Sequence, residues 1–163
     1  PVPQVQWQPD GAAGPWAGVI DGADAVVNLS GAPLAPRRWT TDRKRVLVDS
    51  RVLPNRSLVA AIGAAKTRPR VLVSASAIGY YGDRGDEILT EDSGPGDDFG
   101  ARVCREWEDA TSPAADAGIR VARMRTGLVL AANGGLLKRL SLPWGEASMR
   151  AMTRRSTDQV LAA

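Results

Sequence analysis

Apolar residues gather in three short runs along the chain. They occupy residues 25–29, 70–75 and 119–124 and read AVVNL, RVLVSA and IRVARM. Runs of this length that are bounded by glycine, proline or serine are typical of buried strands. The pattern therefore predicts three β-strands.

Two amphipathic stretches separate these runs and predict helices. The first begins at Thr40 or Thr41, either of which can cap a helix, and its apolar face extends to Ile62. Pro54 lies inside this stretch, so we expect the helix to be kinked or divided there. A second helix is predicted over 99–111, where apolar residues recur at every fourth position: Phe99, Val103 and Trp107.

The alternation of strands and helices predicts an α/β fold with a Rossmann-like parallel sheet. Right-handed crossovers are expected to place flanking helices on both faces of this sheet. Ligands of such sheets bind beyond the carboxyl ends of the strands. Three loops follow the predicted strand ends, and we expect them to line one crevice: 28–33, 74–82 and 125–130.

The composition of the chain excludes several classes of protein. Its 163 residues are 44% hydrophobic and 24% charged, which is ordinary for one globular domain. No apolar run approaches the roughly 18 residues that a transmembrane helix needs. The lack of histidine and the single cysteine exclude a disulfide framework, the usual zinc sites and histidine-based catalysis. We therefore expect no metal, no membrane contact and, without a signal peptide, a cytoplasmic location.

The charged residues are distributed unevenly. The net charge is only +3, from 21 basic and 18 acidic residues. Residues 37–56 and 138–155 are basic, whereas residues 83–98 are acidic. A basic segment can meet phosphates, but solvated helix faces explain the same pattern. Nucleic acid is therefore the least favoured partner.

The loop after the second predicted strand holds a dense group of polar residues. Ser74 and Ser76 lie at the strand end, and Tyr80 and Tyr81 follow in the loop. Serine can hydrogen-bond a substrate oxygen, and tyrosine can transfer a proton where a cation lies nearby. Alternatively, the serines cap the next turn and the tyrosines pack at its rim.

The other two loops offer weaker signals. Residues 28–31 are small enough to let a ligand approach the backbone, although an ordinary turn has the same composition. Arg125 near the third strand end can clamp a phosphate or carboxylate, or form a structural ion pair. Cys104 is expected in the core, and Glu108 is expected to be a solvated acid.

At these loops the sequence resembles the extended, atypical short-chain dehydrogenase/reductase group, and within it the NAD(P)-dependent epimerase/dehydratase-like branch of "epimerase family proteins". The order and spacing of the matching pieces agree over about residues 24–144. The pieces are DAVVNLSGAPLAPRRWT at 24–40, DSRV at 49–52, VLVSASAIGYYGD at 71–83, CREWEDA at 104–110 and RVARMRTGLVLAANGGLLKRL at 120–140.

This resemblance implies an oxidoreductase- or epimerase-like protein that binds NADP or NAD and acts on an unknown small-molecule substrate. Ser76, or less readily Ser74, would match the active-site serine, and Tyr80 or Tyr81 would help to protonate the reacting oxygen. The residues that would contact the cofactor are Asn28, Leu29, Ser30, Gly31, Arg51, Ser74, Arg125, Thr126 and Gly127.

The sequence also departs from the family pattern. It contains no glycine-rich turn to hold a pyrophosphate at a helix N-terminus. The usual Tyr-x-x-x-Lys pair is missing too: Asp98 or Phe99 replaces the tyrosine, and Arg102 stands where the lysine is expected. Arginine can supply positive charge there but cannot shuttle a proton.

We therefore expect a partial copy of the family domain. Residues 1–23 would be an irregular lead-in, 24–144 a partial Rossmann domain without its first βαβ unit, and 145–163 a divergent basic tail in place of the substrate-binding domain. An uncovered strand edge favours association, so a homodimer, partial disorder or a repacked fold is expected. The alternatives are a non-catalytic nucleotide-binding or regulatory module and an interaction protein without a cofactor.

Overall fold

The computed structural model describes residues 3–34 and 38–129. The chain divides into two compact units, Pro1–Arg125 and Thr126–Ala163. The first unit contains the helices and strands described below, apart from the last residue of the third strand. Among the described residues, no helix has both the length and the apolar character needed to cross a membrane.

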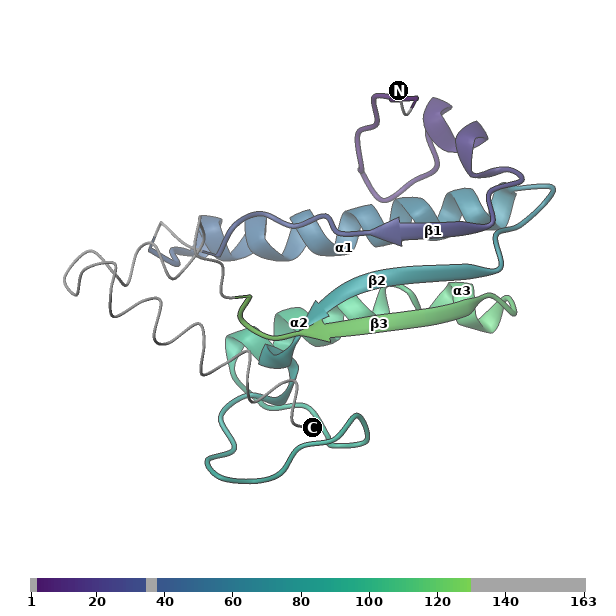
Figure 1. The fold of residues 1–163 in the computed structure, drawn as a ribbon. Coiled ribbons are helices and arrows are strands. Elements are labelled where there is room, and N and C mark those ends of the chain that lie inside the picture. The colour runs from purple at the N-terminus through teal and green to yellow at the C-terminus, as the bar shows by residue number, and fades with distance from the viewer. Residues whose placement is uncertain (1–2, 35–37, 130–163) are drawn as a thin grey trace, which may run out of the picture. The chain divides into compact units, whose positions relative to one another are not determined.

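A three-stranded sheet forms the centre of the first unit. Its strands are β1 (Ala25–Asn28), β2 (Val71–Ala77) and β3 (Arg120–Thr126), in the order β1-β2-β3. β1 and β2 are parallel, with Asn28 opposite Ser74, and all three arrows point the same way in Figure 1. The predicted parallel, Rossmann-like α/β fold is confirmed.

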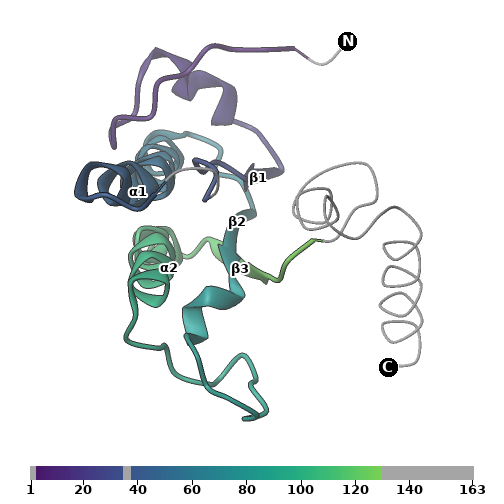
Figure 2. The same ribbon diagram turned by 90° about the vertical axis from the view of Figure 1, so that its left-hand side faces the viewer.

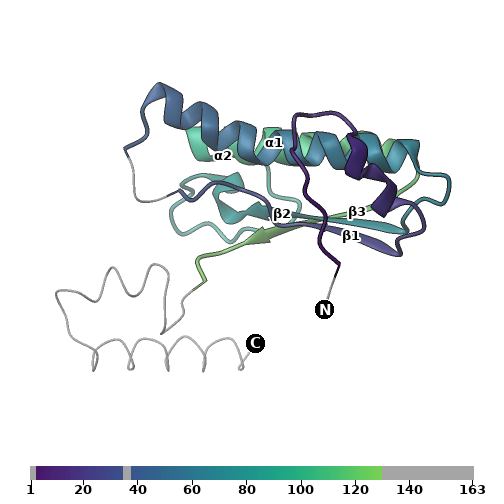
Figure 3. The same ribbon diagram turned by 90° about the horizontal axis from the view of Figure 1, so that it is seen from above.

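The helices cover one face of this sheet. They are α1 (Thr41–Ala64), α2 (Phe99–Asp109) and the short α3 (Ser112–Asp116). Figures 2 and 3 show α1 and α2 on the same side of the strands. The expectation of helices on both faces therefore fails for the described residues. The strand order explains why: the chain crosses the sheet in one direction, and right-handed crossovers change face only where that direction reverses.

The first helix runs without a break through Pro54. Its N-terminus is capped by the Thr40 side chain, which accepts a hydrogen bond from the Arg43 backbone N–H at 3.3 Å. The prediction that Pro54 divides the helix is wrong. Leu47 and Ile62, on either side of the proline, are both buried, so packing on one face keeps the two halves in one helix.

The core lies between the sheet, α1 and the N-terminal segment. That segment was expected to be irregular, but it contains a 3-10 helix at Pro15–Ile20, whose Trp16 and Ile20 are buried. Val26, Leu72 and Ile62 complete the centre of the same cluster. Because of this packing, the even-numbered residues of β1 and β2 are buried and the odd-numbered residues are not. This alternation decides which polar side chains enter the site.

Candidate functional site

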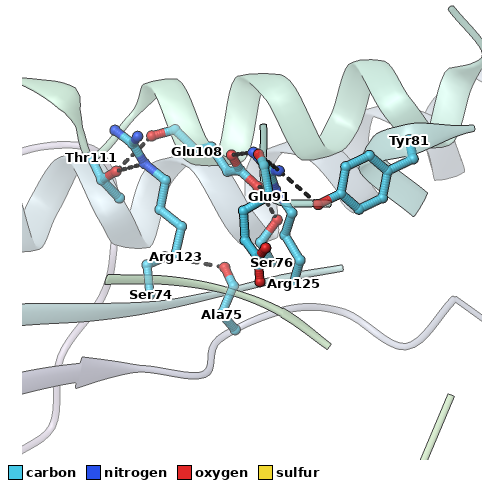
Figure 4. Close-up of polar contacts among 9 residues, drawn as sticks. All are labelled: Ser74, Ala75, Ser76, Tyr81, Glu91, Glu108, Thr111, Arg123 and Arg125. Carbon is cyan, nitrogen blue, oxygen red and sulfur yellow. Dashed lines mark hydrogen bonds and ion pairs between the residues drawn. The ribbon is translucent and has the colours of Figure 1, made fainter. Parts of the chain in front are cut away.

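Glu108 is the centre of a buried polar cluster between β2, β3 and α2. Its Oε1 atom accepts a hydrogen bond from Ser76 Oγ at 2.6 Å and another from Arg125 Nε at 2.9 Å. Its Oε2 atom accepts a third from Arg125 Nη2 at 2.9 Å. Figure 4 shows these contacts meeting at one carboxylate. Glu108 is only 6% exposed, so its charge depends on these partners.

Arg125 connects this carboxylate to the two tyrosines. Its Nη1 atom donates to the Tyr81 hydroxyl at 2.9 Å and to the Glu91 carbonyl at 3.1 Å. Its guanidinium carbon lies 3.5 Å from the centre of the Tyr80 ring. We call Ser76, Tyr80, Tyr81, Glu108 and Arg125 the Glu108 cluster.

In the ion pair of this cluster, Glu108 and Arg125 each stabilise the charged form of the other. Burial raises the pKa of Glu108, but hydrogen bonds from Arg125 and Ser76 outweigh burial and hold that pKa below its usual value. The carboxylate in turn raises the pKa of Arg125 above its ordinary value. Both groups are therefore charged at neutral pH, and an ionised carboxylate accepts the Ser76 hydroxyl hydrogen.

The strands place these side chains by alternation. Ser74 and Ser76 are the buried, helix-facing residues at the carboxyl half of β2. Arg125 lies on β3, and the tyrosines belong to a 3-10 turn, Ile78–Tyr81, that directly follows β2. The structure thus brings together Ser76, Tyr80, Tyr81 and Arg125, which sequence reasoning had selected from two separate loops.

Sequence reasoning missed Glu108, which was expected to be solvated. A signal was present in the helix pattern. Ala101, Cys104 and Glu108 follow the i, i+3, i+7 spacing of one helix face, and all three are buried. Cys104 lies in the core as expected, and burial raises the pKa of its thiol.

A second buried network joins residues that were predicted to contact a cofactor. Asn55 of α1 accepts a hydrogen bond from Asn28 Nδ2 at 2.6 Å and donates to Ser74 Oγ at 2.9 Å and to the Trp107 carbonyl at 3.0 Å. Asn28 and Ser74 are 2% and 1% exposed. Their side chains therefore tie β1 and β2 to the helices, and Asn55 was another residue that the sequence analysis missed.

The loop at 28–31 is held firmly by α1. Asn28 Oδ1 accepts the Ser30 N–H at 3.0 Å, which shapes the turn after β1. Just beyond it, the Ala32 carbonyl accepts a hydrogen bond from Arg51 Nη2 at 3.1 Å. A Cβ atom on Gly31 would lie 3.3 Å from the Arg51 guanidinium carbon, so glycine permits this close approach. Leu29 is exposed beside it.

Arg51 is a buried cation without an acidic partner. It is 8% exposed, and its described contacts are the Leu47 and Ala32 carbonyls, the Ser50 hydroxyl and the Trp107 ring. Among the described residues, no carboxylate forms an ion pair with it. Burial accordingly lowers its pKa. A phosphate at the 28–31 loop would supply the missing negative charge.

The predicted residues do not all share one cavity. A cavity of about 600 Å³ at the edge of β1 is lined by Asn28, Leu29 and Ser30 together with apolar N-terminal residues, and none of its lining residues belongs to the 74–82 loop. Thr126 ends β3 and Gly127 follows it, but both belong to the second unit. Residues from 130 onward lie outside the described part of the chain. No group of side chains suited to a metal ion occurs among the described residues.

Comparisons with known proteins give the lineage of this arrangement. No family model matches the chain. It is 42% identical over 138 residues to "Epimerase family protein Mb2239" of Mycobacterium bovis, an overlap that covers 84% of this chain and 44% of the relative. The chain thus spans less than half the length of the curated relatives that it matches.

Two solved structures share both sequence and fold with the chain. A nucleoside-diphosphate sugar epimerase from Corynebacterium glutamicum matches with a TM-score of 0.70 and 43% identity, covering 86% of this chain and 29% of that one. Human epimerase family protein SDR39U1 (isoform2), solved with NADPH, matches with a TM-score of 0.68 and 30% identity, covering 78% and 45%. By sequence and by fold, the chain is homologous to part of the epimerase family proteins, of the extended short-chain dehydrogenase/reductase kind.

Proposed function

We propose that the chain forms part of an NAD(P)-dependent epimerase- or oxidoreductase-like site. The observation that carries this proposal is Arg51, a buried guanidinium without an acidic partner among the described residues, placed against the glycine of the loop that follows β1. That combination suits a phosphate group of a dinucleotide. The NADPH in the human relative's structure supports the same choice of cofactor class.

The residues that would contact the dinucleotide lie in the loop after β1 and on α1. The loop from Leu29 to Gly31, in which Leu29 and Gly31 are exposed, would lie along the adenosine and pyrophosphate side of the dinucleotide, next to Arg51. When bound, the nicotinamide supplies hydride exchange with a carbinol or carbonyl carbon.

The catalytic residues of this proposal are Ser76, Tyr80 and Tyr81. Ser76 would hold the reacting oxygen, and a tyrosine would move its proton. The support is the Glu108 cluster, in which the Ser76 hydroxyl bonds to Glu108, the Tyr81 hydroxyl bonds to Arg125 and the Tyr80 ring lies against the Arg125 guanidinium.

A non-catalytic nucleotide-binding module is the second candidate function. It is favoured by the residues at the family's Tyr-x-x-x-Lys position, where Asp98 or Phe99 replaces the tyrosine and Arg102 replaces the lysine. The Arg102 guanidinium lies 5.5 Å from the Phe99 ring centre, so this position holds a cation–π contact and no hydroxyl. This candidate predicts cofactor binding without turnover.

The test is a titration of the 163-residue chain with NADPH and with NADH, followed by tryptophan fluorescence and melting temperature. Arg51→Gln should weaken binding by at least about tenfold, because each unit of phosphate-paired charge contributes about 1.5–3 kcal/mol through charge-assisted hydrogen bonds. Arg56→Gln is the matched control, since Arg56 is exposed on the same helix. Absence of binding by the unaltered chain would contradict the proposal.

A further inference from the structure

We propose that Tyr81 is the proton donor of this site and that Arg125 supplies the positive charge which the missing lysine would supply, with Glu108 as the residue that positions Arg125. The inference rests on the proposed function: it chooses Tyr81 over Tyr80 as the donor and gives Arg125 and Glu108 roles that the sequence motifs did not assign. In this proposal the family's Tyr-x-x-x-Lys pair is replaced by Tyr81 in the turn after β2, Arg125 on β3 and Glu108 on α2.

The direction of the hydrogen bond identifies Tyr81 as a donor. Arginine can only donate, so the 2.9 Å contact from Arg125 Nη1 makes the Tyr81 oxygen the acceptor. The phenol hydrogen is thereby left to be given to another oxygen. As that hydrogen leaves, the charge that develops on the phenol oxygen lies against a fixed guanidinium.

Glu108 fixes the guanidinium in the required orientation. Its two oxygens bind Nε and Nη2 of Arg125, each at 2.9 Å, which is the bidentate geometry that sets the plane of the group. The remaining nitrogen, Nη1, points to Tyr81 and to the Glu91 carbonyl. Four of the five N–H donors of Arg125 are therefore engaged within the protein, which favours an internal role over direct cofactor binding.

The Glu108 carboxylate also determines which hydrogen-bonding role is left to the Ser76 hydroxyl. The Ser76 hydroxyl donates its only hydrogen to Glu108 at 2.6 Å. Its oxygen lone pairs are then the groups left for a substrate, so Ser76 accepts a hydrogen bond from a substrate hydroxyl. Ser76 and Tyr81 thus have opposite polarity, one an acceptor and the other a donor.

The chemical step balances with these roles. When bound, a reduced nicotinamide dinucleotide would supply a hydride, with its two electrons, to a carbonyl carbon; its own C–H bond would break and leave it oxidised. Tyr81 would give its proton to the carbonyl oxygen. A C–H bond and an O–H bond form on the substrate, the Tyr81 O–H bond breaks, and the product is an alcohol. The phenolate stays paired with Arg125 until a proton from water restores it.

The experiment uses the 163-residue chain with NADPH and two small carbonyl probes, benzaldehyde and diacetyl. Tyr81→Phe and Arg125→Gln should each lower kcat by about 10²-fold or more, the usual range for losing a general acid. The dissociation constant for NADPH, measured by fluorescence, should stay that of the unaltered chain. Arg125→Lys should restore part of kcat because it keeps the charge, and Glu108→Gln should lower kcat without changing NADPH binding.

Arg123→Gln provides the matched control. Arg123 lies two residues earlier on β3, but its guanidinium bonds to Thr111 Oγ1 and Ser112 Oγ, each at 3.0 Å. Its loss removes the same charge from the same strand without touching Tyr81. It should leave kcat close to that of the unaltered chain.

Three results would overturn the inference while leaving the proposed function intact. NADPH binding without reduction of either probe would do so, as would equal effects of the Arg125 and Arg123 substitutions. Loss of turnover in Tyr80→Phe together with normal turnover in Tyr81→Phe would assign the donor to the other phenol. Failure of the unaltered chain to bind NADPH would instead contradict the proposed function, and the inference would fall with it.

Discussion

At the scale of single residues, the site depends on the buried charge of Glu108, which requires hydrogen-bonding partners. Glu108 is almost fully buried, and such a carboxylate is tolerated only when other groups replace its water. Ser76 and Arg125 make that replacement with three hydrogen bonds. Removing one partner therefore lowers the unfolding free energy strongly, because a buried charge is left unpaired. The intact pair itself contributes little unfolding free energy compared with apolar residues packed in its place.

Glu108→Gln tests this dependence through pH. At neutral pH the variant should lose about 3 kcal/mol of unfolding free energy, because Arg125 is left without its carboxylate. The pKa of Glu108 is depressed in the folded chain, so its stabilisation is complete above the unfolded pKa of about 4.3 and is lost as the pH falls through the folded pKa. Urea unfolding of both chains should therefore converge in acid.

The control is Glu106→Gln, an exposed acid on the same helix. It should change the unfolding free energy little at any pH. A difference between Glu108→Gln and the unaltered chain that stays constant from neutral to acid pH would show that Glu108 acts by packing and not by charge.

The residues that sequence reasoning found and missed differ in what decides their burial. Ser76 and Tyr81 could be predicted from the sequence because strand alternation and position after a strand end are local properties. Glu108 and Asn55 were not, because a polar side chain is buried only if partners meet it. Those partners are remote: Arg125 is 17 residues away from Glu108, and the Trp107 carbonyl is 52 away from Asn55.

At the scale of elements, the turn after β2 depends on a close backbone contact with the acidic loop. The Gly96 N–H donates to the Tyr80 carbonyl at 2.9 Å. A Cβ atom at Gly96 would lie 2.7 Å from the Tyr81 carbonyl oxygen and 2.8 Å from Gly82 Cα. Because both neighbours are backbone atoms, they cannot move aside without displacing the turn that carries the tyrosines.

Gly96→Ala should therefore lower the unfolding free energy by about 1–3 kcal/mol, the usual cost of overpacking. Gly94→Ala is the control, since nothing lies within 4 Å of a Cβ added there. Urea unfolding of the two variants provides the comparison. Equal stability of the two would contradict the proposed contact between the loop and the turn.

Element prediction succeeded where local pattern decides structure. The three strands and two main helices follow hydrophobic periodicity and capping residues, and the structure contains all of them. The division of the helix at Pro54 was wrong because the local cost of the proline is outweighed by the buried face of α1, whose partners lie in the sheet. The side on which the helices pack was also missed, because it depends on strand order and not on any one segment.

At the scale of the whole first unit, the sheet has one helix-covered face and an apolar edge at β1. Val27 is 60% exposed and Leu29 77% exposed, beside a cavity of about 600 Å³. An edge strand presents unpaired N–H and C=O groups, and apolar side chains next to them promote association. These features support the proposal that the chain forms a homodimer through this edge.

Val27→Lys should shift the chain toward monomer in sedimentation velocity, because a lysine on an edge strand must be desolvated before another strand can pair there. Val46→Lys is the matched control: Val46 is 46% exposed on α1, so the same substitution changes the net charge equally without altering the strand edge. If both variants reduce association alike, net charge and not the β1 edge is responsible. If the unaltered chain is already a monomer at high concentration, the dimer proposal fails. The Glu108 cluster would then have to act within one chain, as its hydrogen bonds already allow.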